Sequence, residues 1–381
     1  MRRIFITGSL AGQTLLSCVL AVPVMAAACG SESGVGPGRS GLIIRWTSPR
    51  TQPGADWTNG APAVDDGRVF VQDGNQLLAL DASTGARLWS RAVRVAAAPP
   101  PTTLRAADGV VYLSETDSIM AVNGATGATI WTLHPDSQTV TEPALDATTF
   151  YTGQRGIPVV YAVARTDGSV RWKVNVGAGY QYLAHVRGVA VSGDTVYAAV
   201  ERYLDRNGAS ASGVLVALAR SDGHELWRYE TPGTKDFLLD APRPVGRLIL
   251  VNDFYTGDLI AVDMVSHQEV WRTPVGGTMH MAVVDQTVLT AGVDTKARGL
   301  DLATGTVKWT AATGSSAFGI GTCGGSFYVS AFQLRRYDVA TGQITGEAQV
   351  GSMEGGFVTH VASDGASVFV AGTSGVTSFR C

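Results

Sequence analysis

Two histidines are the first candidates for metal or haem chemistry. His280 is flanked by Met279 and Met281, and imidazole and thioether groups are both competent metal ligands. His360 holds the same place in a later copy of the repeat described below, because each histidine precedes an expected strand by eight residues. In the ring that this repeat predicts, the two histidines lie a quarter turn apart, which is too far to share one ion. We therefore expect both to line a central channel, bonded to backbone or water, and we expect no catalytic, cofactor or metal site.

A charged segment offers binding chemistry. Between Trp172 and Trp227 the spacing of the repeat lengthens to 55 residues, and the extra residues lie near 201–208. Its candidate contact residues are Arg202, Tyr203, Leu204 and Arg206. Tyrosine and arginine are favoured at binding hot spots, and loops on a rigid scaffold commonly carry recognition. We interpret the segment as a partner-binding loop between the second and third strands of its repeat; the alternative is a surface insertion without a partner.

The first 28 residues have the features of a bacterial secretory signal. Two arginines open the chain, residues 4–25 are mostly apolar, and three alanines precede Cys29. A cysteine directly after such a cleavage site resembles a lipobox, which implies lipid modification of Cys29. Residues 30–40 are rich in Gly, Ser and Pro, as in a flexible tether, whereas Cys18 is followed by residues that are still apolar. We expect a lipidated cysteine and tether at 29–41; ordinary cleavage without a lipid is the alternative.

The other two cysteines, Cys323 and Cys381, lie in the last two copies of the repeat. Two cysteines in an exported protein either form a disulfide or remain free thiols. Neighbouring blades of a ring would bring them together, and the bond would fix the C-terminus. The sequence leaves both outcomes open.

A repeat of about 40 residues positions these groups. Its first copy, residues 79–89, reads as the end of one strand, a turn and a second strand that closes on a tryptophan. Gly85 supplies the positive φ that such a short turn needs. We expect the closing tryptophans to stack between neighbouring units, where each buries a large apolar face. They are Trp46, Trp89, Trp131, Trp172, Trp227, Trp271 and Trp309, and a further copy has Gly346 in place of the tryptophan.

The two ends of the chain complement each other. Residues 42–47 form a lone closing strand, and the residues after Gly346 hold three strands without a fourth. An unpaired sheet edge invites association with other chains, so the N-terminal strand is expected to complete the last unit. The prediction is an all-β, eight-bladed β-propeller of four-stranded blades over residues 42–381, preceded by a signal peptide at 1–28.

The repeated Ala-Leu-Asp-x-x-Thr-Gly-x-x-x-Trp resembles the tryptophan-docking motif of PQQ-like β-propeller repeats of the quinoprotein dehydrogenase type. The resemblance extends over nearly all of residues 42–381. With the lipobox and eight blades, the chain also resembles the BamB-type lipoproteins of the outer-membrane β-barrel assembly machinery. This second resemblance is one of architecture, because no binding-loop motif of that family is identifiable. It implies a scaffold that presents loops to protein partners.

A quinone (PQQ)-dependent dehydrogenase is the main alternative. The resemblance implies that such enzymes carry a vicinal disulfide, a calcium site and a catalytic Asp. This chain is much shorter, has no Cys-Cys pair, and shows no carboxylate and amide set with calcium-loop spacing. A propeller that binds a small ligand or sugar is a third interpretation. The net charge of −3 gives no basic field for nucleic acid.

The sequence therefore predicts an exported, lipid-anchored monomer that acts as a non-enzymatic interaction scaffold in the cell envelope and binds no PQQ. Its expected partners are envelope proteins, in the most concrete version the β-barrel assembly machinery. No second apolar run approaches ~20 residues, so we expect membrane contact only through the lipid. Gly30 stands where an Asp would resemble an inner-membrane retention signal, which favours the outer membrane, facing the periplasm.

Overall fold

The computed structural model consists of β-strands, with no helix in the part of the chain that it describes. The described residues are 40–51, 61–94, 104–115, 117–136, 141, 143–154, 156–232, 241–253, 256–317, 319–350, 358–372 and 375–381. The predicted signal peptide, Cys29 and the tether as far as residue 39 lie outside these ranges. Within them, no helix has the length and apolar character that crossing a bilayer requires.

Each of the first four blades contains four antiparallel strands in chain order. Blade 1 consists of β3 (Ala63–Asp65), β4 (Arg68–Asp73), β5 (Gln76–Asp81) and β6 (Arg87–Ala92). Blade 2 consists of β7 (Leu104–Ala107), β8 (Val110–Ser114), β9 (Ile119–Asn123) and β10 (Thr129–Leu133). Blade 3 consists of β11 (Ala144–Leu145), β12 (Thr149–Gly153), β13 (Val159–Ala164) and β14 (Val170–Asn175). Blade 4 consists of β15 (Ala184–Ser192), β16 (Thr195–Tyr203), β17 (Ala211–Ala219) and β18 (Glu225–Glu230).

The second half of the chain repeats the pattern up to the last blade, which takes one strand from the start of the chain. Blade 5 consists of β19 (Arg243–Val245), β20 (Leu248–Asp253), β21 (Asp258–Asp263) and β22 (Glu269–Pro274). Blade 6 consists of β23 (Thr278–Val284), β24 (Thr287–Gly292), β25 (Lys296–Asp301) and β26 (Val307–Ala312). Blade 7 consists of β27 (Gly319–Cys323), β28 (Ser326–Ser330), β29 (Gln333–Asp338) and β30 (Ile344–Gln349). Blade 8 consists of β31 (Val358–Ser363), β32 (Ser367–Gly372), β33 (Gly375–Arg380) and β2 (Ile44–Pro49).

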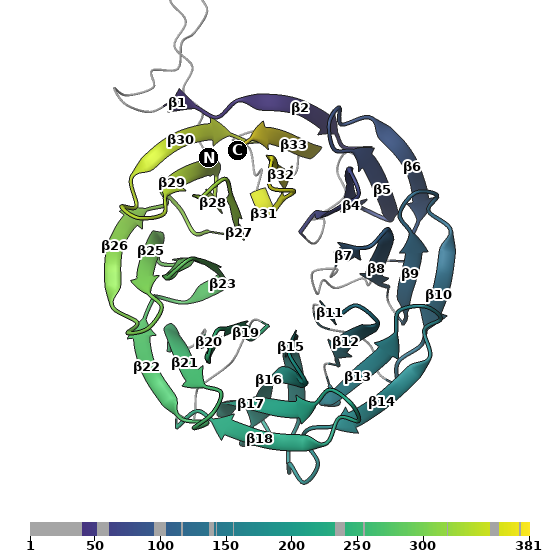
Figure 1. The fold of residues 1–381 in the computed structure, drawn as a ribbon, viewed down its shortest axis with the longest axis vertical. Coiled ribbons are helices and arrows are strands. Elements are labelled where there is room, and N and C mark those ends of the chain that lie inside the picture. The colour runs from purple at the N-terminus through teal and green to yellow at the C-terminus, as the bar shows by residue number, and fades with distance from the viewer. Residues whose placement is uncertain are drawn as a thin grey trace, which may run out of the picture. The chain divides into compact units, whose positions relative to one another are not determined.

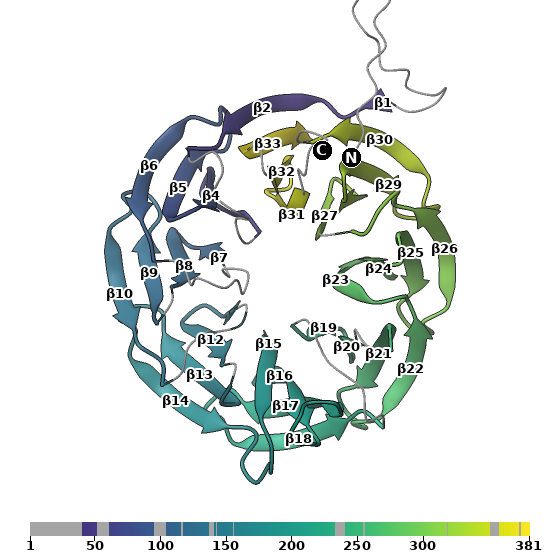
Figure 2. The ribbon, with the colours of Figure 1, turned by 180° about the vertical axis from the view of Figure 1, so that it is seen from behind.

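The blades stand side by side in a ring (Figure 1). The first strand of a blade, such as β15 or β23, lies toward the centre, and the fourth, such as β18 or β26, forms the outer rim; Figure 2 shows the same order from behind. The third strand is packed on both faces by neighbouring blades, so it is a continuous apolar run: all six residues of β13 are buried. The outer β14 instead alternates between exposed and buried positions, as a strand with one solvated face does.

The N-terminal strand closes the ring. β2 pairs antiparallel with β33, with Trp46 opposite Ser378, and so supplies the fourth strand of blade 8. The predicted eight-bladed propeller and its mode of closure are confirmed. A short β1 (Ser40–Gly41), at the end of the predicted tether, adds a fifth, parallel strand to blade 7 through pairing with β30.

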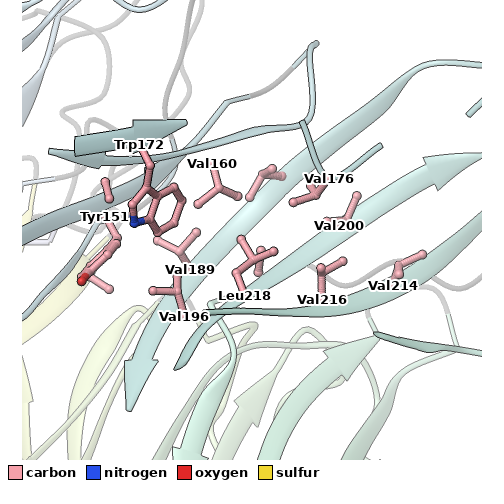
Figure 3. Packing of buried hydrophobic residues seen from close by; sticks show 14 of the residues in the cluster. Tyr151, Val160, Trp172, Val176, Val189, Val196, Val200, Val214, Val216 and Leu218 are labelled. Atoms are coloured by element: carbon pink, nitrogen blue, oxygen red, sulfur yellow. The ribbon is translucent and has the colours of Figure 1, made fainter. Parts of the chain in front are cut away.

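Tryptophans fill the junctions between blades. Trp271 of blade 5 donates from Nε1 to the carbonyl oxygen of Leu302 in blade 6, at 3.0 Å. Its ring covers Gly305, which has φ +70° and no room for a side chain, because a Cβ would lie 2.5 Å from the indole. Figure 3 shows the junction between blades 3 and 4, where Trp172 packs against Val160, Val189 and Leu218. Equivalent hydrogen bonds to a backbone oxygen of the next blade are made by Trp46, Trp89, Trp131, Trp172 and Trp309.

The junction between blades 4 and 5 varies this arrangement. His267 stands where the other turns have glycine, and it takes a positive φ of 61°. Trp227 stacks on its imidazole, with ring centroids 4.6 Å apart and an interplanar angle of 16°. The tryptophan therefore meets a flat side chain at this junction, where elsewhere it meets bare backbone.

The junction between blades 7 and 8 has no tryptophan, since Gly346 stands at that position. Instead a disulfide joins Cys323 of blade 7 to Cys381, with Cα atoms 5.6 Å apart. Leu42, which follows β1, is buried in the same apolar cluster as Cys323. A covalent bond and a leucine from the N-terminal segment thus hold this junction.

A candidate binding surface on blade 4

The segment singled out in the sequence forms the end of a long hairpin in blade 4. β15, β16 and β17 each have nine residues, whereas most strands of the other blades have five or six. Every residue of β16 pairs with β17, from Thr195 opposite Ala219 to Tyr203 opposite Ala211. Residues 204–210, here called the blade-4 loop, connect the two strands. Because successive strands alternate in direction, this loop lies on the face that carries the connections between blades, opposite the turns under the tryptophans.

Backbone hydrogen bonds fix the blade-4 loop. Leu204 donates its N–H to the carbonyl of Ser210 at 2.9 Å. Asp205 Oδ1 accepts from the N–H groups of Ala209 and Asn207, and these bonds, chiefly that of Ala209, hold the pKa of Asp205 below its ordinary value. Gly208 takes a φ of 68° that suits glycine. The Asp205 carboxylate is therefore committed to shaping the loop.

A hollow opens beside the loop. It has a volume of about 360 Å³, at the low end of the range of ligand pockets, ~300–1,000 Å³. Its apolar wall is Tyr182, Leu183 and Tyr203, and residues 205–208 form its other side. The Leu183 side chain is 48% exposed, and the Tyr203 ring is held edge-on to the His185 imidazole at 5.5 Å. The hollow is therefore open to solvent, with an apolar wall on one side and the polar blade-4 loop on the other.

Most of the charges around the hollow are already paired. The Arg202 guanidinium lies over the Tyr180 ring at 4.9 Å and donates to Glu230 at 2.9 Å. Arg228 donates to the Tyr180 hydroxyl at 2.9 Å, and burial raises the pKa of that hydroxyl. Glu201, near the loop end of β16, is ion-paired with Arg187 and is only 2% exposed. These contacts hold the side chains around the hollow in place.

Arg206 is the exception. Its side chain is exposed at the tip of the loop, and among the described residues no acidic group pairs with it. The structure thus divides the four predicted contact residues: Tyr203 lines the hollow, Arg206 borders it with a free charge, Leu204 is half-buried, and Arg202 is used internally. The Arg202 guanidinium is thus bonded to Glu230 and Tyr180 around the hollow, and its contact with a partner stays a prediction.

Tyr180, Tyr182 and Leu183 were missed by the sequence analysis. They lie in the connection that enters blade 4, about twenty residues before the hairpin loop, so only the fold brings them to it. The run Tyr-Gln-Tyr-Leu at 180–183 was a signal, because large apolar side chains in a connecting segment need a packing partner or a ligand.

The two histidines that were predicted to line the channel occupy equivalent positions in the backbone register. His280 is opposite Ala291 and His360 is opposite Ala371, each just after a register shift in the first strand of its blade. No group of three or more His, Cys, Asp or Glu side chains suited to a metal ion occurs among the described residues.

A family model described as outer membrane protein assembly factor BamB matches residues 43–203 and 211–379. The two matched ranges span the propeller and omit residues 204–210, which are the blade-4 loop. No curated protein matches the chain.

Solved structures share the fold at low sequence identity. BamB from Moraxella catarrhalis is 14% identical with a TM-score of 0.68, and the match covers 89% of this chain and 100% of that one. The computationally designed protein Ika8 is 14% identical with a TM-score of 0.70, over 90% of this chain and 100% of that one. Quinohemoprotein alcohol dehydrogenase ADHIIG from Pseudomonas putida HK5 is 13% identical with a TM-score of 0.67, over 89% and 76%. At such identities the likeness establishes the propeller fold alone.

Proposed function

The chain belongs to the family described as outer membrane protein assembly factor BamB, and we propose that it is a lipid-anchored, non-enzymatic scaffold that binds envelope proteins through its blade-4 surface. The proposed process is the assembly of outer-membrane β-barrel proteins. The observation that carries the proposal is the exposed hollow of Tyr182, Leu183 and Tyr203 beside the unpaired Arg206. Aromatic and arginine side chains on a rigid frame are the usual anchors of protein interfaces.

The disulfide supports an exported protein. Structural disulfides persist in oxidising compartments, such as the bacterial periplasm, and are rare in the cytosol. The Cys323–Cys381 bond therefore agrees with a secretory signal at residues 1–28. Anchoring through Cys29 and placement at the outer membrane remain parts of the proposal.

A scaffold is favoured over a quinone-dependent dehydrogenase. The match to the quinohemoprotein dehydrogenase covers 76% of that chain, whereas the match to BamB covers the whole of it. The sequence also has no adjacent cysteine pair. The residues assembled on blade 4 suit recognition, since their charged members are paired with each other or face solvent.

The proposal is tested by affinity purification of the anchored protein from its own membranes, with native mass spectrometry of the eluate. In a shortened variant, Asn-Gly replaces residues 204–210, which lets β16 and β17 join through a two-residue hairpin turn. We expect the parent protein to recover a subunit of the β-barrel assembly machinery and the shortened variant to lose it.

A matched control keeps the loop and changes the opposite face of the same blade, with Ser221→Arg in the exposed turn after β17. This control should recover the same subunit as the parent. A parent protein that yields no protein partner but carries a mass matching a quinone or a metal would contradict the proposal.

A further inference from the structure

Two buried polar atoms at the junction between blades 5 and 6 have no hydrogen-bond partner. Asn252 in β20 is 1% exposed and Thr290 in β24 is fully buried. Asn252 Oδ1 and Thr290 Oγ1 form no hydrogen bond with any described residue. Buried amide and hydroxyl oxygens are almost always satisfied in folded proteins, because leaving one unpaired costs stability.

Both side chains point into the same junction. Asn252 donates from Nδ2 to the carbonyl of Thr278 in β23 at 2.7 Å, so its amide faces blade 6. Thr290 lies opposite Arg298 in the register of β24 and β25 and shares its face. Arg298 donates to the carbonyl of Val275, just after β22 of blade 5, at 2.7 Å, so that face is turned toward blade 5. The two unpaired oxygens therefore lie on the facing surfaces of neighbouring blades.

We propose that a buried water molecule bridges this junction, hydrogen-bonded to both Asn252 Oδ1 and Thr290 Oγ1. Buried waters characteristically make about three hydrogen bonds to polar groups that would otherwise be unsatisfied. A water suits this site better than a cation does. Both ligands are neutral, and the charged groups on the same face, Arg298 and Asp294, already pair with each other. The water thus connects blade 5 to blade 6 through hydrogen bonds, in addition to the apolar contacts that Trp271 makes between them.

The substitution Thr290→Val tests the proposal through the direction in which it changes the stability of the protein. Valine has nearly the shape of threonine without its hydroxyl. If a water bridges the junction, the substitution removes one of its partners and the unfolding equilibrium constant should rise about fivefold, as for one lost hydrogen bond. If the hydroxyl is truly unpaired, the substitution relieves a penalty and the constant should fall.

The same substitution is then made in an Asn252→Leu background, where the other end of the bridge is missing. The fivefold effect should shrink toward unity there, because the water already lacks its amide partner. A high-resolution crystal structure of the parent chain should show a density peak within hydrogen-bond distance of both atoms. A stabilised Thr290→Val variant, or a clear map without that peak, would overturn the proposal.

Discussion

The ring is held together in two ways. At the junction between blades 5 and 6, the indole of Trp271 covers a hairpin turn and its Nε1 donates to Leu302. At the junction between blades 7 and 8, the equivalent backbone position belongs to Cys381. Both residues follow the third strand of their blade and donate their N–H to the turn between its first two strands, Leu302 to Gln286 and Cys381 to Ala366. At the junction between blades 7 and 8, the disulfide from Cys323 therefore ends at the backbone position that an indole contacts at the other junction.

This difference follows from where the ring is closed. A docking tryptophan packs on the hairpin turn between the third and fourth strands of the next blade, where the residue at positive φ is a glycine or, under Trp227, His267. Blade 8 has no such turn, because its fourth strand, β2, comes from the other end of the chain. Gly346 thus stands where a tryptophan would have no turn to cover. The disulfide and Leu42 occupy that junction instead.

The largest effect is expected from removing an indole. Trp271→Ala deletes a side chain that is only 8% exposed together with its hydrogen bond, and should destabilise the protein by about 4 kcal/mol. The neighbouring Val270→Ala is the control; Val270 is 49% exposed, so the change should be below about 0.5 kcal/mol. Denaturant unfolding measures both. Similar losses for the two variants would contradict the assigned role of the indole.

Replacing the disulfide should have a somewhat smaller effect. The two cysteines have a sequence separation of 58, and loss of the bond in the Cys323→Ser/Cys381→Ser variant should cost about 3 kcal/mol. Hydrogen exchange sharpens the comparison. In the variant without the disulfide, exchange should accelerate first in β31, β33 and β2. In Trp271→Ala it should accelerate first in blades 5 and 6. The same pattern in both variants would mean that the junctions do not open separately.

The smallest effect on stability is expected from Asp81, the acidic residue of the hairpin turn under Trp46. Hydrogen bonds from Ser83 and Thr84 lower the pKa of Asp81 from 3.8 to about 2. A pKa lowered in the folded state adds stability above the unfolded value and loses it as pH falls through the folded value. Asn123 fills the same role in blade 2, accepting from Ala125 and Thr126. Asp81→Asn should therefore keep the turn and weaken the acid sensitivity of unfolding between about pH 5 and pH 2.

The reverse substitution serves as the control for this prediction. Asn123→Asp should add acid sensitivity over the same pH range, because it introduces a carboxylate into the same cage of donors. Denaturation midpoints measured against pH would show both changes. Identical acid limbs for the parent and both variants would refute the assignment.

The sequence was sufficient to predict the fold because its signal is repeated. Each closing tryptophan except Trp227 is followed by a glycine turn in the next copy, so register, blade count and closure by residues 42–47 could all be inferred, and the family match agrees with the motif. What the sequence did not reveal depends on single tertiary contacts. The place of Leu42 in the last junction, and the stacking of His267 on Trp227, have no periodic signal.

The candidate surface was predicted in part. The lengthened repeat located the hairpin, and Tyr203 and Arg206 do border the hollow. Arg202 looked equally available in the sequence, but its guanidinium is held by Glu230 and Tyr180, which lie on other segments. Side-chain pairing of this kind depends on which segments the fold brings together, and composition does not encode it.

The central claim is that the blade-4 surface contacts an envelope protein, and site-specific photo-crosslinking in intact cells tests it most directly. A crosslinking amino acid is placed at position 206, in the blade-4 loop, or at position 221, in the exposed turn on the opposite face of the same blade. The account predicts a discrete adduct with a β-barrel assembly subunit from position 206 and none from position 221. Adducts of equal yield from both positions, or none from position 206 in a folded protein, would contradict it.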